Sequence, residues 1–263
     1  PMLVTTLNGL RVHYRVEGDP TGAPIVFGNS LGTDLRVWDK LLALLPPGLR
    51  ILRYDMRGHG LTDAPEGAYF MGDLVADAAA LMDATGFRGA VFVGLSIGGV
   101  VAQGLAAERP DLVRAAVLSN TAAKVGTEAG WNERIATVRA NGIEAIADHV
   151  MGLWFTKAFH ANRAEELALW RNMMTRTPLD GYLGCCAAIA GTDLRESTTG
   201  LRLPVLALVG DQDGSTPPDL VHETAESIPG ARFEIIRGAG HIPCVEQPEA
   251  TAALIQRFLA EIG

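Results

Sequence analysis

Residues 94–99 read Gly94-Leu95-Ser96-Ile97-Gly98-Gly99, and this stretch indicates both the architecture and the chemistry of the chain. The apolar run 90–93 before it is typical of a buried strand, and residues 100–109 after it are typical of a helix that ends at Pro110. A serine between two glycines at a strand-to-helix junction is the G-x-S-x-G nucleophile elbow. The turn is so tight that the serine backbone is strained, and a Cβ at position 94 or 98 would collide with neighbouring chain. We expect Ser96 to present its hydroxyl at a helix N-terminus, where free N–H groups favour negative charge; the alternative is a glycine-rich turn without chemical function.

Composition and charge limit the possible partners. The chain has 263 residues, of which 48% are hydrophobic and 20% charged, as in an ordinary globular protein of one large domain or a domain with an insertion. A formal net charge of −8 argues against nucleic acid and anionic membranes as partners, and an anionic substrate would need a local cation. We expect a small lactone or ester as substrate and leave open whether the protein forms a homo-oligomer.

The cysteines and the N-terminal residues indicate a cytoplasmic protein. Of three cysteines, Cys185 and Cys186 are adjacent, and no C-x-x-C pair occurs, so a disulfide framework and a zinc site are not expected. Residues 2–6 lack the basic and long apolar regions of a signal peptide, and no run of residues approaches a membrane span.

Strand-like and helix-like segments alternate along most of the chain. The runs 3–6 and 11–16 flank the hairpin turn signal Asn8-Gly9. Further strands are predicted at 24–27, 50–54, 90–93, 115–118, 204–209 and 232–236. Helices are predicted at 37–45, 71–85, 100–109, 220–227 and 248–262. This alternation predicts an α/β fold with a mostly parallel sheet and helices on both faces.

The alternation stops between residues 121 and 201. Four segments there have helical patterns, and none of them is a convincing strand: 131–140, 143–155, 164–175 and 179–190. An all-helical insertion in an α/β alternation indicates a lid over the sheet. We therefore predict a core domain of residues 1–120 and 202–263, with residues 121–201 inserted as a helical lid.

A serine nucleophile needs a base, and the base needs a group that orients it. Functional groups of parallel sheets follow the carboxyl ends of strands, and the loop after the predicted strand 204–209 offers Asp211 and Asp213. We assign Asp213 as the orienting acid, because Asp211 directly follows the strand whereas Asp213 has room to turn towards a histidine. Asp211 is then expected to stabilise a loop or cap a helix.

Among the six histidines, His241 fits the role of base. It lies in the small-residue loop 238–243, past the last predicted strand. The other histidines either precede the serine or lie on predicted helices: His13, His59, His149, His160 and His222. The alternative for His241 is a loop histidine that caps a turn.

The tetrahedral intermediate of such a reaction needs two N–H donors. We expect one from the backbone of Ile97, the residue after the nucleophile. The other is assigned to the backbone of Leu31, in the polar loop 28–34 that follows a predicted strand.

These motifs resemble those of the α/β-hydrolase superfamily, and the resemblance covers nearly the whole chain, including the turn 55–60 before the elbow. More narrowly, the chain resembles the 3-oxoadipate enol-lactonases, at residues 29–33, 94–99, 119–123, 131–134, 188–193 and 210–218. Many α/β-hydrolases have His-Gly in the oxyanion loop, whereas this chain has Asn29-Ser30, as those lactonases do.

The resemblance implies an α/β-hydrolase fold, with a mostly parallel sheet of about eight strands, an N-terminal hairpin and a helical lid. It implies hydrolysis of a five-membered enol lactone with an acetate side chain, opened to 3-oxoadipate in the β-ketoadipate pathway of aromatic degradation. Ser96 would form an acyl-enzyme, and neither a metal nor an organic cofactor is needed. Other esterases, perhydrolases and carbon–carbon bond hydrolases share most of the motifs and stay open as alternatives, as does a non-catalytic ligand receptor of the same fold.

The carboxylate of that substrate would need a cation in an acidic protein. Arg134, beside Trp131 at the start of the lid, is the candidate; the alternative is an arginine on a solvated helix face. Arg57 is expected to serve structure. Trp131 and Trp154 are candidate walls of the substrate pocket, although tryptophans at helical positions are more often core, and Asn29 is a further candidate contact.

Overall fold

Eight strands form one sheet in the computed structural model, which describes residues 1–263. The sheet order is β1-β2-β4-β3-β5-β6-β7-β8; β1 and β2 form an antiparallel hairpin, β2 pairs antiparallel with β4, and all other pairs are parallel. The bounds are β1 (Leu3–Leu7), β2 (Leu10–Gly18), β3 (Ala23–Gly28), β4 (Leu49–Tyr54), β5 (Ala90–Leu95), β6 (Val113–Ser119), β7 (Val205–Gly210) and β8 (Arg232–Ile236). The mostly parallel sheet and its N-terminal hairpin agree with the sequence prediction.

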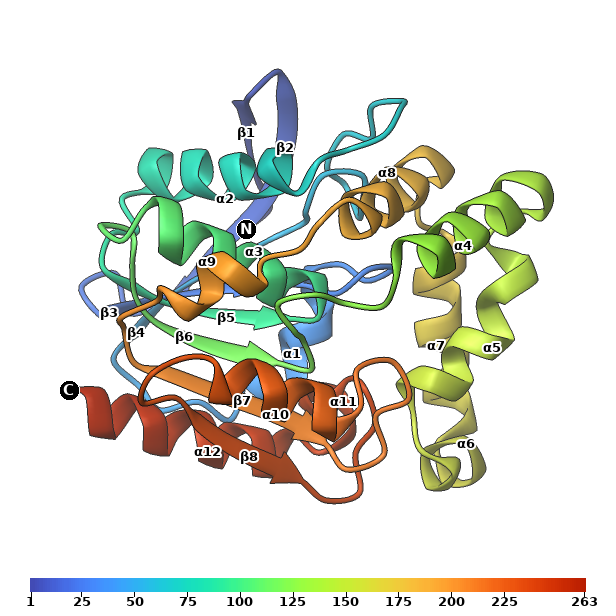
Figure 1. The fold of residues 1–263 in the computed structure, drawn as a ribbon. Helices are drawn as coiled ribbons and strands as arrows, with labels where there is room; N and C mark the ends of the chain where they lie inside the picture. The colour runs from blue at the N-terminus through green and yellow to red at the C-terminus, as the bar shows by residue number, and fades with distance from the viewer.

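Helices cover both faces of this sheet (Figure 1). The helices α2 (Met71–Thr85), α3 (Ile97–Glu108) and α10 (Pro218–Glu226) each lead to a strand further along the sheet in one direction, whereas α1 (Asp39–Leu42) leads from β3 back to β4. Because parallel crossovers are right-handed, the first three lie on one face and α1 on the other. The last helix, α12 (Pro248–Ile262), packs against α1. The central strands are thereby covered on both sides, which explains their continuous apolar sequences.

Six helices connect β6 to β7, and five of them lie beyond the carboxyl ends of the strands, at the right of Figure 1. These are α4 (Glu128–Asn141), α5 (Glu144–Trp154), α6 (Lys157–Asn162), α7 (Ala164–Thr175) and α8 (Leu179–Ala190). The sixth, α9 (Arg195–Thr199), packs on α3, where the hydroxyl of Thr198 donates to Oε1 of Gln103 at 2.8 Å. The inserted segment is entirely helical, and its last helix packs with the core.

The predicted helix 37–45 is wrong in both start and length. A 3-10 turn, η1 (Leu35–Trp38), comes first, and α1 ends at Leu42. Asp34 starts η1 by accepting a hydrogen bond from the N–H of Arg36 at 2.9 Å, so the helical turn begins two residues earlier than predicted. The sequence analysis also missed α6, α9 and α11 (Pro243–Glu246), which have six, five and four residues and are too short to show a helical period.

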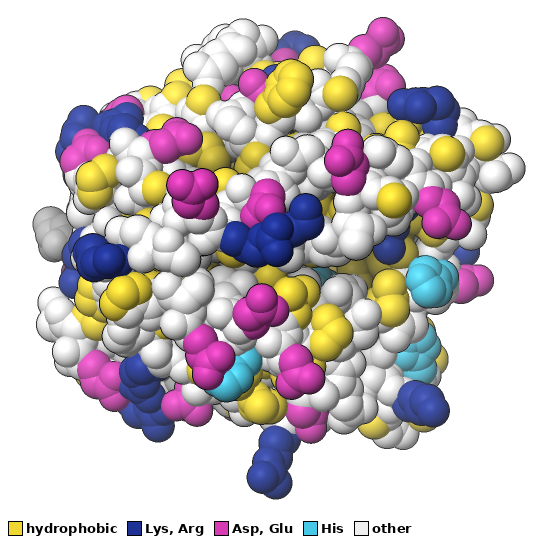
Figure 2. Space-filling view, in the orientation of Figure 1, with side chains coloured by type: hydrophobic (Ala, Val, Ile, Leu, Met, Phe, Trp, Pro, Cys, Tyr) yellow, Lys and Arg dark blue, Asp and Glu magenta, His cyan; other side chains and the backbone are white.

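Acidic and basic side chains are interspersed on the face of the molecule shown in Figure 2. All three cysteines are buried and unpaired. None of the helices combines the length and the apolar composition that crossing a membrane would require.

Candidate active site

Ser96 joins β5 to α3 in a backbone conformation that few residues other than glycine adopt, with φ of +54° and ψ of −116°. Close packing of the surrounding backbone keeps Ser96 in this strained conformation. A Cβ on Gly94 would lie 2.2 Å from the carbonyl oxygen of Gly98, and a Cβ on Gly98 would lie 2.3 Å from that of Gly28. Both glycines are therefore required, as the sequence predicts, and they keep the partly exposed Ser96 at the carboxyl end of the sheet.

Two loops at the same edge bring Asp213 and His241 together. Asp213 follows β7 and His241 follows β8, and Nδ1 of the imidazole lies 2.8 Å from Oδ2 of the carboxylate. Both side chains are buried. Because a carboxylate only accepts hydrogen bonds, Nδ1 carries the proton and donates it, which leaves the lone pair of the neutral ring on Nε2. His241 can therefore act as a base through Nε2.

Asp213 is held by several donors besides His241. Its Oδ1 accepts from the N–H groups of Ser215 and Thr216 at 2.8 and 2.9 Å. Its Oδ2 accepts from the hydroxyl of Thr216 at 2.9 Å and from Nδ2 of Asn120 at 2.8 Å. Burial alone would raise the pKa of the Asp213 carboxyl, but the attraction of His241 and these hydrogen bonds outweigh it and hold the pKa below its ordinary value. The carboxylate stays charged and fixes the orientation of the imidazole.

The neighbouring Asp211 has a different set of partners. Its Oδ1 accepts from the N–H groups of Gly238 and Ala239 at 2.9 and 3.3 Å. It therefore links the loop after β7 to the loop after β8, and the structure brings Asp213 rather than Asp211 to the histidine.

Asn120, which supports Asp213, was missed by the sequence analysis. It follows β6 with a φ of +54°, and its amide donates to the carbonyl oxygen of Gly240 at 3.2 Å as well as to Asp213. The hydroxyl of Ser119 donates to Oδ1 of Asn120 at 2.6 Å, which orients the amide. The available signal was its position directly after a strand that lies between the serine strand and the acid strand.

The two backbone donors assigned to the oxyanion are free. Ile97 is the first residue of α3, and N–H groups in the first turn of a helix have no partner within it. The N–H of Leu31 makes no hydrogen bond to another protein group. Both groups can therefore donate to a ligand.

His59 supports the loop that carries Leu31. Its Nε2 accepts from the N–H of Gly32 at 2.9 Å, and its Nδ1 lies 3.3 Å from the carbonyl oxygen of Arg57. Complete burial of the ring lowers its pKa to about 4, so it is neutral near pH 7, with its proton on Nδ1. The sequence analysis set His59 aside because it precedes the serine, although the turn after β4 lies at the same sheet edge.

The assignment of Asn29 to the substrate is wrong in this structure. Its side chain points into the core, where Nδ2 donates to the carbonyl oxygen of Tyr54 and Oδ1 accepts from the indole of Trp38, both at 2.7 Å. Because both ends of the amide are engaged, Asn29 anchors the oxyanion loop instead.

Arg134 lies on α4 as a half-buried cation that forms no ion pair. Its guanidinium carbon lies 4.8 Å from the centre of the Trp131 ring. Burial raises the pKa of the Cys186 thiol to about 12, and the charge of Arg134 opposes this rise, so Arg134 lies near α8. Arg57, in contrast, forms two hydrogen bonds to Asp77 at 2.8 and 3.0 Å, which agrees with the structural role that the sequence predicts.

The helical segment between β6 and β7 contacts both the loop that carries Leu31 and the loop that carries His241. A Cβ on Gly32 would lie 3.4 Å from the ring of Trp154, the last residue of α5. The carbonyl oxygen of Trp154 accepts from the N–H of His241 at 2.8 Å. Beside it, the buried Glu246 accepts from the N–H of Gly240 at 3.0 Å and from the hydroxyl of Thr156. Residues of the helical segment between β6 and β7 therefore help to position His241.

Comparison with known proteins agrees with this geometry. Residues 23–248 match the family model described as alpha/beta hydrolase fold. The 3-oxoadipate enol-lactonase 2 of Acinetobacter baylyi is 32% identical over 257 residues, which cover 96% of each chain. The crystal structure of the enol-lactonase from Burkholderia xenovorans has a TM-score of 0.95 at 36% identity and covers 98% of this chain and 100% of that one.

Similarity also extends beyond the lactonases. The non-heme chloroperoxidase of Streptomyces lividans is 29% identical, with 94% of this chain and 95% of that protein covered. The family match, the eight-stranded sheet and the loops around Ser96 lead to one conclusion: the chain belongs to the α/β-hydrolase family, and within it is similar to the 3-oxoadipate enol-lactonases.

Proposed function

We propose that the protein is a serine hydrolase that opens 3-oxoadipate enol-lactone to 3-oxoadipate. The observation that carries the hydrolase chemistry is the Asp213–His241 pair at the sheet edge that also holds Ser96 and the free N–H of Leu31. Similarity to enol-lactonases supports the substrate, and so does the unpaired Arg134 in the lid.

In the first step Oγ of Ser96 attacks the carbonyl carbon of the lactone, while Nε2 of His241 accepts the hydroxyl proton. The N–H groups of Leu31 and Ile97 donate to the oxygen that becomes negative. Collapse of the intermediate breaks the bond between the carbonyl carbon and the ring oxygen, and the protonated His241 gives its proton to that oxygen. The product is an acyl-enzyme that carries the leaving group as a tethered enol, and an enolate leaves more readily than a simple alkoxide.

The second half of the reaction releases the product. When the tethered enol takes up a proton on carbon and releases its hydroxyl proton, it becomes a ketone and loses the oxygen nucleophile that could close the ring again. Water then attacks the acyl carbonyl with His241 as base, which frees the new carboxylate and restores Ser96. In sum, one water molecule is added to the lactone.

Arg134 is the proposed partner of the substrate carboxylate. Arg134→Met should lower kcat/KM on the carboxylated lactone by a factor equivalent to about 2–4 kcal/mol of transition-state stabilisation. This is the range for removing one partner of a buried charge pair. A neutral enol lactone with a methyl group in place of the acetate should be little affected. Arg134→Lys should recover only part of the loss, because it replaces a planar fork by a point charge.

The control for this experiment is Arg139→Met, which removes an exposed arginine from the same helix. Equal losses on the charged and the neutral lactone would show that Arg134 supports the lid rather than the substrate.

The enol-lactonase proposal itself fails if the wild-type protein hydrolyses a simple aryl ester, or forms a peracid from acetate and hydrogen peroxide, more efficiently than it opens the lactone.

A further inference from the structure

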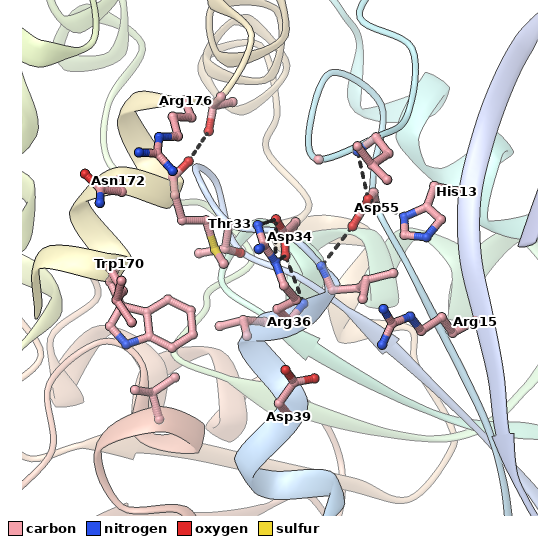
Figure 3. Close-up of a pocket in the computed structure, with 18 of the residues that line it drawn as sticks. His13, Arg15, Thr33, Asp34, Arg36, Asp39, Asp55, Trp170, Asn172 and Arg176 are labelled. Carbon is pink, nitrogen blue, oxygen red and sulfur yellow. Dashed lines mark hydrogen bonds and ion pairs between the residues drawn. The ribbon is translucent and has the colours of Figure 1, made fainter. Parts of the chain in front are cut away.

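A pocket of about 770 Å³ lies between α7 and the segment that follows the loop 28–34 (Figure 3). Its size is within the range of small-molecule sites. Neither Ser96 nor His241 lines it, so it is separate from the site described above. The proposed hydrolase chemistry leaves this pocket without a role.

Two basic side chains in the lining of this pocket have no acidic partner. Each acid in the lining already has a partner within the protein: Asp34 with Arg36, Asp39 with Arg53, Asp55 with His13 and Glu166 with Lys40. Of the basic side chains in the lining, Arg15 and Arg176 form no ion pair. The lining thus holds four acids and, besides His13, four basic side chains, and two of its guanidinium groups have no acidic partner.

The two free arginines belong to different parts of the fold. Arg15 extends from β2 of the core, whereas Arg176 directly follows α7 of the lid, and they lie on opposite sides of the pocket in Figure 3. Trp170 and Met173 of α7 add an apolar wall. Two separated cations with apolar surface nearby match a molecule that has an aliphatic middle and a carboxylate at each end.

His13 provides independent evidence that the β2 side of the pocket lacks a hydrogen-bonding group. Its Nδ1 lies 2.7 Å from Oδ2 of Asp55, but its Nε2 is the only buried side-chain nitrogen or oxygen in the structure without a hydrogen-bond partner. Proteins seldom leave a buried polar atom unpaired unless a ligand or water completes it. His13 and Arg15 are two residues apart on β2 and so lie on the same face of the strand.

We propose that this pocket is a second ligand site, which binds a small aliphatic dicarboxylate with one carboxylate on Arg15 and the other on Arg176. A ligand oxygen next to Arg15, or a water that it retains, supplies the partner that Nε2 of His13 lacks. Because one arginine belongs to the core and the other to the lid, the bound molecule connects the two.

Adipate is the probe for this site, and the His13 ring is the reporter. Titration of protein labelled with 15N-histidine, with the ring signals assigned from a His13→Gln spectrum, should give a saturable shift of the His13 signals. Arg15→Met and Arg176→Met should each raise the Kd of this shift at least tenfold. Arg139→Met, which removes an exposed arginine outside the pocket, should leave the Kd unchanged. Arg134→Met should also leave it unchanged, which separates this site from adipate bound near Ser96.

The length-matched ligands hexanoate and hexane-1,6-diol test the dicarboxylate assignment. Hexanoate should bind more weakly than adipate, and the diol should cause no shift. The proposal is overturned if millimolar adipate leaves the His13 signals in place, if hexanoate binds as tightly as adipate, or if Arg15→Met and Arg139→Met have the same Kd. Arg15→Lys, which keeps the charge, should retain part of the affinity and guards against a folding defect in Arg15→Met. The readout is binding alone, so it does not depend on the proposed lactonase activity.

Discussion

Two Asp–His pairs in this molecule have nearly the same local geometry and different surroundings. In each pair a buried aspartate follows a parallel strand, and its carboxylate lies next to Nδ1 of a histidine, at 2.8 Å for Asp213–His241 and 2.7 Å for Asp55–His13. The first pair shares its sheet edge with the strained Ser96 and two free N–H groups. The second has its histidine within β2 and no serine elbow beside it. In the proposed function, the dyad alone therefore does not define the hydrolytic site; the elbow and the free donors are needed as well.

The second pair instead organises backbone. Asp55 accepts from the N–H groups of Leu35 and Leu61, both at 2.9 Å, so it ties the turn after β4 to the segment behind the oxyanion loop. The same turn carries His59, which bonds the N–H of Gly32. The turn that Asp55 holds in place therefore also supports the loop that carries Leu31.

The largest expected effect is on the nucleophile, which distinguishes the two pairs. Ser96→Ala should lower kcat on the order of 10⁶-fold, as for removal of the serine from other hydrolytic triads, while both Asp–His pairs stay in place. Steady-state kinetics and circular dichroism of the purified variant would measure this. Near wild-type turnover in a folded variant would contradict the assignment of Ser96.

Asparagine in place of either aspartate compares the pairs directly. Asp213→Asn should lower kcat about 10⁴-fold, because the amide favours the wrong tautomer of His241. Asp55→Asn should lower the free energy of unfolding by about 1–3 kcal/mol through weakened buried hydrogen bonds, but it should leave most of the turnover of the folded enzyme. Urea denaturation and kinetics of the same preparations would test both, with Asp211→Asn as a control that changes a neighbouring acid. The reverse ranking of Asp211 and Asp213 would move the orienting role to Asp211.

His59 connects the turn after β4 to the loop that carries Leu31, and its replacement should have an intermediate effect on kcat. His59→Leu removes the acceptor of the Gly32 N–H and should lower kcat by roughly 10²-fold, the lower end of the loss of one oxyanion donor, with a smaller change in KM. His59→Gln offers an amide oxygen in its place and should recover part of kcat. Equal kinetics of the two variants would mean that the ring fills space and does not position the loop.

The buried ring of His59 also predicts a pH dependence of stability. The pKa of His59 is about 4 in the folded protein and near 6.5 in an exposed histidine, so between these values the unfolded chain binds a proton that the folded chain does not. The free energy of unfolding should therefore decrease as the pH falls from about 6.5 to about 4. The difference between wild type and His59→Gln in urea denaturation at several pH values isolates this contribution. A constant difference across this range would contradict the buried neutral ring.

The elbow was predictable because it is local: two glycines, a serine and the flanking apolar runs are contiguous in the sequence. The choice between Asp211 and Asp213 also rested on a local argument, the distance of each acid from the strand end. The supports of Asn120 and His59 were not predictable in this way, because each bonds a loop that is distant in the sequence and adjacent only in the sheet.

The assignment of Asn29 failed for a related reason. The direction of a loop side chain depends on the partners that the fold supplies, here the carbonyl of Tyr54 and the indole of Trp38. The pocket beside α7 likewise has no motif, because its walls come from β2 and from α7, which only the folded chain brings together.

The bond from the N–H of His241 to the carbonyl oxygen of Trp154 has a consequence for protein engineering. A chimaera that takes its lid from another member of the family can replace this main-chain acceptor with any residue, provided that α5 ends at the same point. The contact between Glu246 and Thr156 is different, because it needs a particular side chain on each side of the graft. A transplanted lid should therefore be accompanied by α11 of its own parent, so that the side-chain contact at position 246 is kept.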